Sequence, residues 1–162
     1  MAGSERVFVG LGANLGDAEA SLHTAAAQLS EIPTTKLVAV SSLYRSAPLD
    51  AQGPDFVNAV AELRTELAPE TLLAELLVQE LRFGRERPYR HAPRTLDLDL
   101  LLYGTRCHQG PSLTLPHPRM HLRAFVLAPL AELAPDWRLS DGRSVVQALA
   151  SLSKQRIKRI SA

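Results

Sequence analysis

Two aspartates, Asp97 and Asp99, are the residues of this sequence best suited to chemistry. They stand in the run Leu-Asp-Leu-Asp-Leu-Leu-Leu-Tyr at residues 96–103. If this run is a strand, both side chains leave the same face, with their Cα atoms about 7 Å apart. Asp is disfavoured in strands, so two of them among leucines require a reason. The carboxylates could hold one or two Mg²⁺ ions, with phosphate oxygens and water as the other ligands. A solvated strand face is the alternative.

The segment just before the aspartates is rich in arginine. Its arginines are Arg85, Arg87, Arg90 and Arg94. Guanidinium groups bind phosphate in a bidentate manner and offset negative charge that develops during phosphoryl transfer. Metal-binding carboxylates beside arginines are typical of phosphoryl-transfer sites. A basic surface loop is the other interpretation of this segment.

Hydrophobic periodicity predicts the elements that must position these residues. Strands are expected at 7–12, 36–45, 56–66 and 96–103. Helices are expected at 15–29, 69–84, 123–134 and 144–152, with Pro129 shortening or kinking the third. The loops at 46–55 and 85–94 are long enough to act as lids.

This order of elements, β-α-β-β-α-β with additions at the C-terminus, is the ferredoxin-like plan. We therefore expect an α+β fold: an antiparallel sheet with the two helices on one face, in a single domain over residues 1–162. Strand alternation places Val57, Ala59, Ala61 and Leu63 toward the helices. The opposite, open face would then hold Phe56, Asn58, Asp97 and Asp99.

Composition argues against several other classes of protein. A net charge of +1 does not indicate a basic surface for nucleic acid, and no apolar segment approaches the length of a membrane span. Cys107 is the single cysteine and cannot form an internal disulfide. The N-terminus lacks the pattern of a signal peptide. We therefore expect a cytoplasmic monomer with small-molecule substrates and with neither nucleic-acid nor membrane partners.

Three other motifs carry less weight. The segment Gly-Leu-Gly-Ala-Asn-Leu-Gly departs from the dinucleotide fingerprint because three residues separate Gly12 from Gly16, so its glycines are expected to form a strand-to-helix turn. His117 and His121 are four apart, but Pro118 lies between them and no Glu follows the first, which disfavours zinc. The basic tail is expected to be a solvated terminus; its cations are Lys154, Arg156, Lys158 and Arg159.

Together, these residues resemble the 6-hydroxymethyl-7,8-dihydropterin pyrophosphokinase family. The strongest match is Arg-His-Ala-Pro-Arg-Thr-Leu-Asp-Leu-Asp-Leu-Leu at residues 90–101. Further blocks agree in order and spacing at 9–17, 41–49, 56–60 and 115–135. The likeness covers about residues 6–150. His91, Ala92, Asp50 and Pro118 depart from the common pattern, all in loops expected to close over the substrates.

The resemblance implies diphosphate transfer from ATP, the co-substrate, to 6-hydroxymethyl-7,8-dihydropterin, giving AMP and the pterin diphosphate in folate biosynthesis. It implies that Asp97 and Asp99 hold two Mg²⁺ ions, and that Arg85 and Arg94 offset charge in the transition state. Positions matching ATP-binding residues are Glu80, Arg85, Arg87, Arg94, Leu100, Thr114, His117 and Arg123. Positions matching pterin-binding residues are Ser46, Leu49, Phe56, Asn58, Asp97 and Phe125.

The same βαββαβ plan leaves other functions open. It also serves RNA-binding modules, which stack bases on aromatic residues of the central strands. In this sequence Asp97 and Asp99 would repel a phosphate backbone unless a metal intervened. An acylphosphatase-like hydrolase or a regulatory ligand-binding domain is a further alternative.

Overall fold

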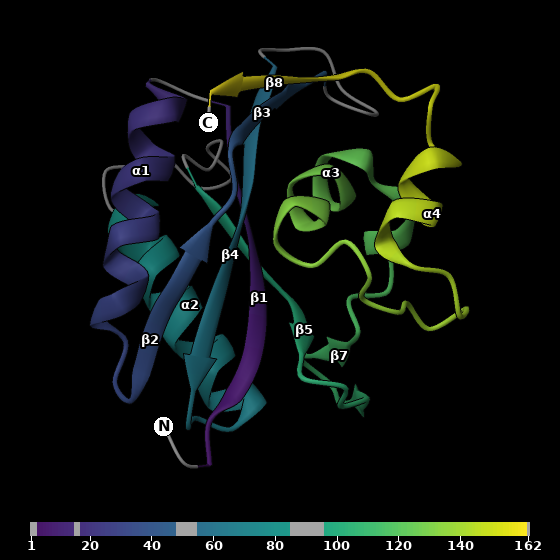
Figure 1. The fold of residues 1–162 in the computed structure, drawn as a ribbon. Coiled ribbons are helices and arrows are strands. Elements are labelled where there is room, and N and C mark those ends of the chain that lie inside the picture. Colours follow the sequence, from purple (N-terminus) through teal and green to yellow (C-terminus); the bar gives the residue numbers. More distant parts are fainter. Residues whose placement is uncertain (1–2, 15–16, 48–54, 85–95, 162) are drawn as a thin grey trace.

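A computed structural model describes residues 3–14, 17–47, 55–84 and 96–161, and Figure 1 shows the fold. Within these residues the main sheet consists of β1 (Glu5–Ala13), β2 (Thr35–Val40), β3 (Leu43–Ser46), β4 (Phe56–Thr65), β5 (Asp97–Tyr103) and β8 (Ile157–Ser161). A small hairpin pairs β6 (His108–Gln109) with β7 (Thr114–Leu115). The helices are α1 (Ala18–Gln28), α2 (Pro69–Gly84), α3 (Ala124–Leu133) and α4 (Val145–Ala150), with 3₁₀ turns at Leu29–Glu31 and Met120–Leu122.

The sheet follows the ferredoxin-like plan, which confirms the α+β prediction. The strand order is β5-β1-β4-β3-β8, with β2 also paired to β4, and all of these pairs are antiparallel. Helices α1 and α2 lie on one face of the sheet, and the C-terminal additions α3 and α4 lie on the other (Figure 1).

A hydrophobic core lies on each face of the sheet. The first contains Val57, Ala59 and Leu63 of β4 with Leu72 and Leu76 of α2, as the strand alternation predicted. The second packs side chains of the opposite face against α3 and α4; its members include Phe8, Val60, Val126, Leu127, Leu130 and Val145. The face expected to be open is therefore covered in part by the C-terminal helices.

The strand predicted at 36–45 is divided in two at Ser41 and Ser42. Ser41 N–H donates to the Val60 carbonyl at 2.9 Å, but Val60 N–H donates to the Ser41 hydroxyl instead of to a main-chain carbonyl. Ser42 N–H leaves the sheet and donates to Glu132 of α3 at 2.9 Å. These side-chain bonds replace part of the main-chain pairing with β4 at the two residues that separate β2 from β3.

Strand alternation predicts Leu102 on the face of Leu96, Leu98 and Leu100; it holds as far as Leu101 and fails at Leu102 because of a β-bulge. Val9 of β1 pairs with Leu100 and Phe8 pairs with Leu102, so Leu101 is an extra residue on β5. Leu101 and Leu102 both join the second core, and Tyr103 turns to the first. Asp97 and Asp99 precede the bulge and keep their predicted common face.

The basic C-terminal tail is a strand and not the solvated terminus that we expected. Arg45 pairs with Lys158 and Ser46 with Ile157, so β8 extends the sheet beyond β3 (Figure 1). Ile160 packs against the first core while Lys158 and Arg159 stay exposed. Among the described helices none is long and apolar enough to span a bilayer.

Candidate active site

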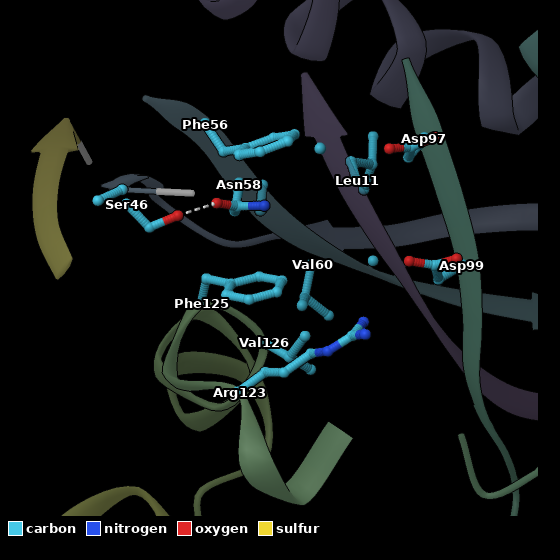
Figure 2. A pocket seen from close by; sticks show the side chains of 14 residues that line it. Leu11, Ser46, Phe56, Asn58, Val60, Asp97, Asp99, Arg123, Phe125 and Val126 are labelled. Atoms are coloured by element: carbon cyan, nitrogen blue, oxygen red, sulfur yellow. Dashed lines mark hydrogen bonds between the residues drawn. The ribbon is translucent and has the colours of Figure 1, made fainter. Parts of the chain in front are cut away.

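A cavity of about 300 Å³ lies on the sheet face beside the N-terminal end of α3. Its lining residues come mainly from β1, β3, β4, β5 and the start of α3, and Figure 2 shows their side chains. The lining residues include Ser46, Phe56, Asn58, Asp97, Asp99, Arg123 and Phe125, each of them a predicted site residue. The fold thus brings together residues that are far apart in the sequence.

Two glycines of the central strand β1 make the floor of the cavity. Gly12 pairs with Asn58 on one side and with Asp97 on the other, and Gly10 pairs with Asp99. A Cβ at Gly12 would lie 3.1 Å from Nδ2 of Asn58, closer than an ordinary contact. The prediction that Gly12 belongs to a strand-to-helix turn is wrong, because it lies inside β1, where the missing side chain leaves the floor bare.

Asn58 is held in one orientation by Ser46. The Ser46 hydroxyl donates to Oδ1 of Asn58 at 2.8 Å, and the two residues are only 5% and 6% exposed (Figure 2). Because Oδ1 accepts this bond, the amide nitrogen is directed away from Ser46. The Nδ2 group can therefore donate to a polar edge of a ligand in the cavity.

Two phenyl rings stand on either side of the Asn58 amide in Figure 2. Phe56 comes from the first residue of β4, and Phe125 from the first turn of α3. Both are half-buried, so part of each ring faces the cavity. A flat, conjugated ring system could lie between them, with its edge at Asn58.

The carboxylates of Asp97 and Asp99 point from β5 toward the same cavity (Figure 2). Asp99 is exposed and Asp97 half-buried. Carboxylate oxygens at the rim of a cavity fit Mg²⁺, which keeps several water or phosphate ligands. Within the described ranges there is no group of three or more His, Cys, Asp or Glu that could hold a metal. A metal at this aspartate pair would therefore have open positions for substrate oxygens.

His117 lies next to this site, beside a second cavity of about 240 Å³. Burial lowers the pKa of its imidazole; Asp99 opposes that shift, and Arg123 and Arg119 add to it. Nδ1 accepts a hydrogen bond from Arg119 N–H at 3.2 Å. In the neutral ring Nε2 then carries the proton and can donate to an anionic oxygen.

Three further predicted residues that the structure describes, Leu100, Thr114 and Glu80, are not among the residues that line the cavity. Leu100 is buried in the first core, and Thr114 is exposed on β7. Oε2 of Glu80 accepts a hydrogen bond from Leu98 N–H at 2.7 Å, between the two aspartates in sequence. Arg85, Arg87, Arg94 and Leu49 lie outside the described residues.

Helix α3, which brings Arg123 and Phe125 to the cavity, is tied to β3 through Glu132. The Glu132 carboxylate accepts from Ser42 N–H and from the Tyr44 hydroxyl. Burial and this carboxylate raise the pKa of Tyr44 to about 12. Burial acts to raise the pKa of Glu132, but the bonds from Ser42 and Tyr44 lower it overall. No periodic pattern in the sequence indicated this contact.

The chain matches one family of known enzymes over most of its length. The model of the family described as 7,8-dihydro-6-hydroxymethylpterin-pyrophosphokinase (HPPK) matches residues 8–135. The 2-amino-4-hydroxy-6-hydroxymethyldihydropteridine pyrophosphokinase of Pseudomonas aeruginosa is 49% identical over 157 residues, which cover 96% of this chain and 97% of the relative. The enzyme of the same name from Haemophilus influenzae is 41% identical over 155 residues, which cover 95% and 97% of the two chains.

Solved structures support the fold. An HPPK-DHPS protein in complex with substrates matches with a TM-score of 0.77 and 11% identity, over 98% of this chain. Wild-type Plasmodium falciparum HPPK-DHPS with pterin and p-hydroxybenzoate matches with a TM-score of 0.72 and 12% identity, over 97% of this chain. The chain spans only 47% and 46% of these two proteins.

The family match covers most of the chain, and both named relatives align with it over nearly their whole length. The chain therefore belongs to the 7,8-dihydro-6-hydroxymethylpterin-pyrophosphokinase family.

Proposed function

We propose that the cavity in Figure 2 is where this pyrophosphokinase joins the diphosphate of ATP to 6-hydroxymethyl-7,8-dihydropterin. The observation that carries this proposal is the meeting of two phenyl rings, a fixed amide and two carboxylates in one cavity. As a member of its family, the chain uses ATP as co-substrate and makes the pterin diphosphate of folate biosynthesis.

The pterin would lie between Phe56 and Phe125. Stacking between rings is worth about 0.5–1.5 kcal/mol beyond the area that it buries. The Asn58 amide would donate to the pterin edge, and the Ser46 hydroxyl keeps that amide from rotating. Leu49, which lies outside the described residues, would add a main-chain contact. This orientation leaves the hydroxymethyl group on the side of the cavity that carries Asp97.

Asp97 and Asp99 would hold two Mg²⁺ ions through their carboxylate oxygens, because the pair has the donor type and the open geometry that Mg²⁺ requires. When bound, these ions neutralise charge on the ATP phosphates and align them for attack. Two carboxylates that face one cavity repel each other, and a bound divalent cation would offset that repulsion.

ATP would occupy the side of the cavity toward β5 and β7. Arg123 projects from the start of α3 into the cavity and would contact phosphate, and a neutral His117 would donate through Nε2. Glu80 and Thr114 would flank the nucleoside, and Leu100, whose side chain is buried in the first core, would contribute through its main chain. Arg85, Arg87 and Arg94 would contact the phosphates and offset charge in the transition state; these three rest on the sequence resemblance alone.

The phosphate groups that are transferred determine which bonds form and break in the reaction. Both the β- and γ-phosphates reach the product, so the pterin hydroxyl oxygen forms a bond to the β-phosphorus. The bond from that phosphorus to the oxygen shared with the α-phosphate breaks, AMP leaves with that oxygen, and the O–H bond of the pterin breaks with release of its proton to water. No His or Glu lines the cavity as a general base in the described residues. Alignment and electrostatics would then supply most of the rate.

Residues 1–162 would act as one domain, as a monomer, in the cytoplasm. The near-neutral net charge is in keeping with small-molecule substrates, because it provides no extended basic surface for nucleic acid. Sedimentation of the pure protein would test the monomeric state.

One experiment tests the function directly. The protein is mixed with ATP, MgCl₂ and 6-hydroxymethyl-7,8-dihydropterin, and the nucleotide products are separated by chromatography. We expect AMP in an amount equal to the pterin consumed. Formation of ADP, or release of AMP that does not depend on the pterin, would contradict diphosphate transfer at this site.

A further inference from the structure

The side chain of Gln155 bridges two main-chain groups on either side of Arg123. Its Oε1 accepts a hydrogen bond from Ala124 N–H at 2.9 Å, and its Nε2 donates to the Leu122 carbonyl at 2.8 Å. Gln155 comes from the turn that follows α4, about 30 residues later in the chain. One amide therefore holds the short segment that joins the 3₁₀ turn at Met120–Leu122 to α3.

The geometry of this segment explains why one amide can make both bonds. Arg123 is extended, with φ −122° and ψ 108°. In an extended chain, the carbonyl before a residue and the N–H after it point to the same side. The Gln155 amide offers one donor and one acceptor to that side, as a neighbouring strand would. The two bonds therefore restrain φ and ψ of Arg123.

The bridge also supplies a cap that α3 lacks in its own sequence. Arg123 stands at the N-cap position and makes no side-chain cap hydrogen bond. The first N–H groups of a helix have no partner within the helix. Gln155 satisfies the first of them, at Ala124, from a distant part of the chain. The start of α3 is thus fixed by a residue of the C-terminal additions.

We propose that Gln155 is a positioning residue of the active site. Both of its hydrogen bonds go to main-chain groups, and they restrain the backbone of Arg123 and the helix turn that carries Phe125, two residues whose side chains line the cavity. The inference rests on the proposed function, since it assigns phosphate binding to Arg123 and pterin stacking to Phe125. Small misplacements of such groups have large effects on rate.

The test compares Gln155→Met with Gln147→Met. Methionine has nearly the length of glutamine but cannot make either bond. Gln147 belongs to the same C-terminal additions, and its Oε1 accepts from Ser144 N–H in the capping box of α4, away from Arg123. The control therefore loses a side-chain bond to the main chain of a different helix start.

Each variant is assayed for AMP formation, for KM of the pterin and of ATP, and for hydrogen exchange at the Ala124 amide. We expect Gln155→Met to lower kcat/KM for the pterin by about 10- to 100-fold and to speed exchange at Ala124. Gln147→Met should leave kcat/KM for the pterin and exchange at Ala124 as they are in the unmodified protein. Its thermal midpoint should change by about as much as that of Gln155→Met. Gln155→Asn, one methylene too short to span both groups, provides a second variant if the first does not fold and should show a smaller loss.

The outcomes separate this inference from the function on which it rests. If Gln155→Met and Gln147→Met had equal kcat/KM for the pterin, Gln155 would have only a structural role. The inference would then be wrong, and the proposed function would stand. Absence of AMP with the unmodified protein would overturn the proposed function, and the positioning role with it. Slow exchange at Ala124 in Gln155→Met would show that the bridge does not hold the segment, whatever the activity.

Discussion

The chemistry proposed for this protein depends first on two carboxylates, and their removal is the most direct test at the scale of single residues. We expect Asp97→Asn and Asp99→Asn each to lower kcat/KM at saturating Mg²⁺ by on the order of 10²- to 10³-fold, the loss typical of a group that offsets transition-state charge. Steady-state AMP formation over a range of Mg²⁺ concentrations would measure the effect.

The folded structure should survive these two substitutions. Both residues lie at the rim of a cavity and outside the two hydrophobic cores, so their thermal midpoints should stay near that of the unmodified protein. Asp136→Asn, at an exposed position beyond α3, makes the same change in net charge and should keep full activity. Near-native turnover in Asp97→Asn would contradict the assignment of Asp97 as a Mg²⁺ ligand.

Gly12 provides a residue-scale test in which stability and affinity should change in opposite directions. Alanine inside a strand is favoured over glycine by about 0.5–1 kcal/mol, because the unfolded chain is less free. The new Cβ would lie 3.1 Å from Nδ2 of Asn58 and push the amide away from its position. We expect Gly12→Ala to raise the Kd for the pterin several-fold while the thermal midpoint holds or rises.

Gly10→Ala is the comparison for this prediction. Its Cβ would meet the Leu101 side chain at 3.5 Å, an ordinary contact, and would leave Asn58 untouched. Fluorescence titration with the reduced pterin would measure both variants. If Gly12→Ala bound the pterin as tightly as the unmodified protein, the close approach of Gly12 to Asn58 would have no part in recognition.

At the scale of elements, the contact of α3 with β3 should give the protein an acid-sensitive component of stability. The pKa of Glu132 is lowered in the folded state, so its contribution is present above the usual pKa of a glutamate. That contribution is lost as the pH falls through the lowered value. In Glu132→Gln the unfolding free energy should therefore fall less steeply between about pH 5 and pH 3 than in the unmodified protein.

Urea unfolding at several pH values would measure this difference, with Glu31→Gln, an exposed residue of the 3₁₀ turn after α1, as the control. The Tyr44 hydroxyl stays protonated throughout this range because its pKa is raised to about 12. Identical slopes in Glu132→Gln and the unmodified protein would exclude the Glu132 contact as the source of acid sensitivity.

The elements also show how far the sequence alone could lead. Period-two patterns in β4 and in the first half of β5 predicted correctly that Phe56, Asn58, Asp97 and Asp99 share a face, because side-chain direction in a regular strand depends only on position. The same reasoning failed at Leu102 and Tyr103, because the bulge at Leu101 depends on the pairing with β1. It failed again at Ser41, whose hydroxyl takes the place of a main-chain partner.

The tail and the closure of the site could not be predicted for a related reason. Residues 157–161 are mostly polar and form a strand only because the edge of β3 is there to pair with them. Most of α3 is buried and apolar, so its sequence gave no direction in which to pack. The position of Phe125 opposite Phe56 was thus implied by the family resemblance and not by any pattern.

At the scale of the whole molecule, the sheet separates two cores that have different relations to the site. The first core, under α1 and α2, supports the strands. The second core holds α3 against the face that carries the cavity, and two members of that helix line the cavity themselves. A destabilising substitution in the second core should therefore weaken substrate binding. An equally destabilising substitution at the distant end of the first core should not.

Leu127 and Leu72 allow this asymmetry to be measured. Both side chains are fully buried, Leu127 in the second core and Leu72 near the start of α2 in the first. Each change to alanine should lower the unfolding free energy by about 2–5 kcal/mol. At a temperature where both variants are folded, Leu127→Ala should also weaken pterin binding, because the space left beneath α3 lets the turn that carries Phe125 shift. Leu72→Ala should bind the pterin as tightly as the unmodified protein does. Urea unfolding and pterin titration on the same samples would measure the unfolding free energy and the Kd for the pterin. If the two variants lost equal stability and bound the pterin equally well, the position of α3 would not limit recognition.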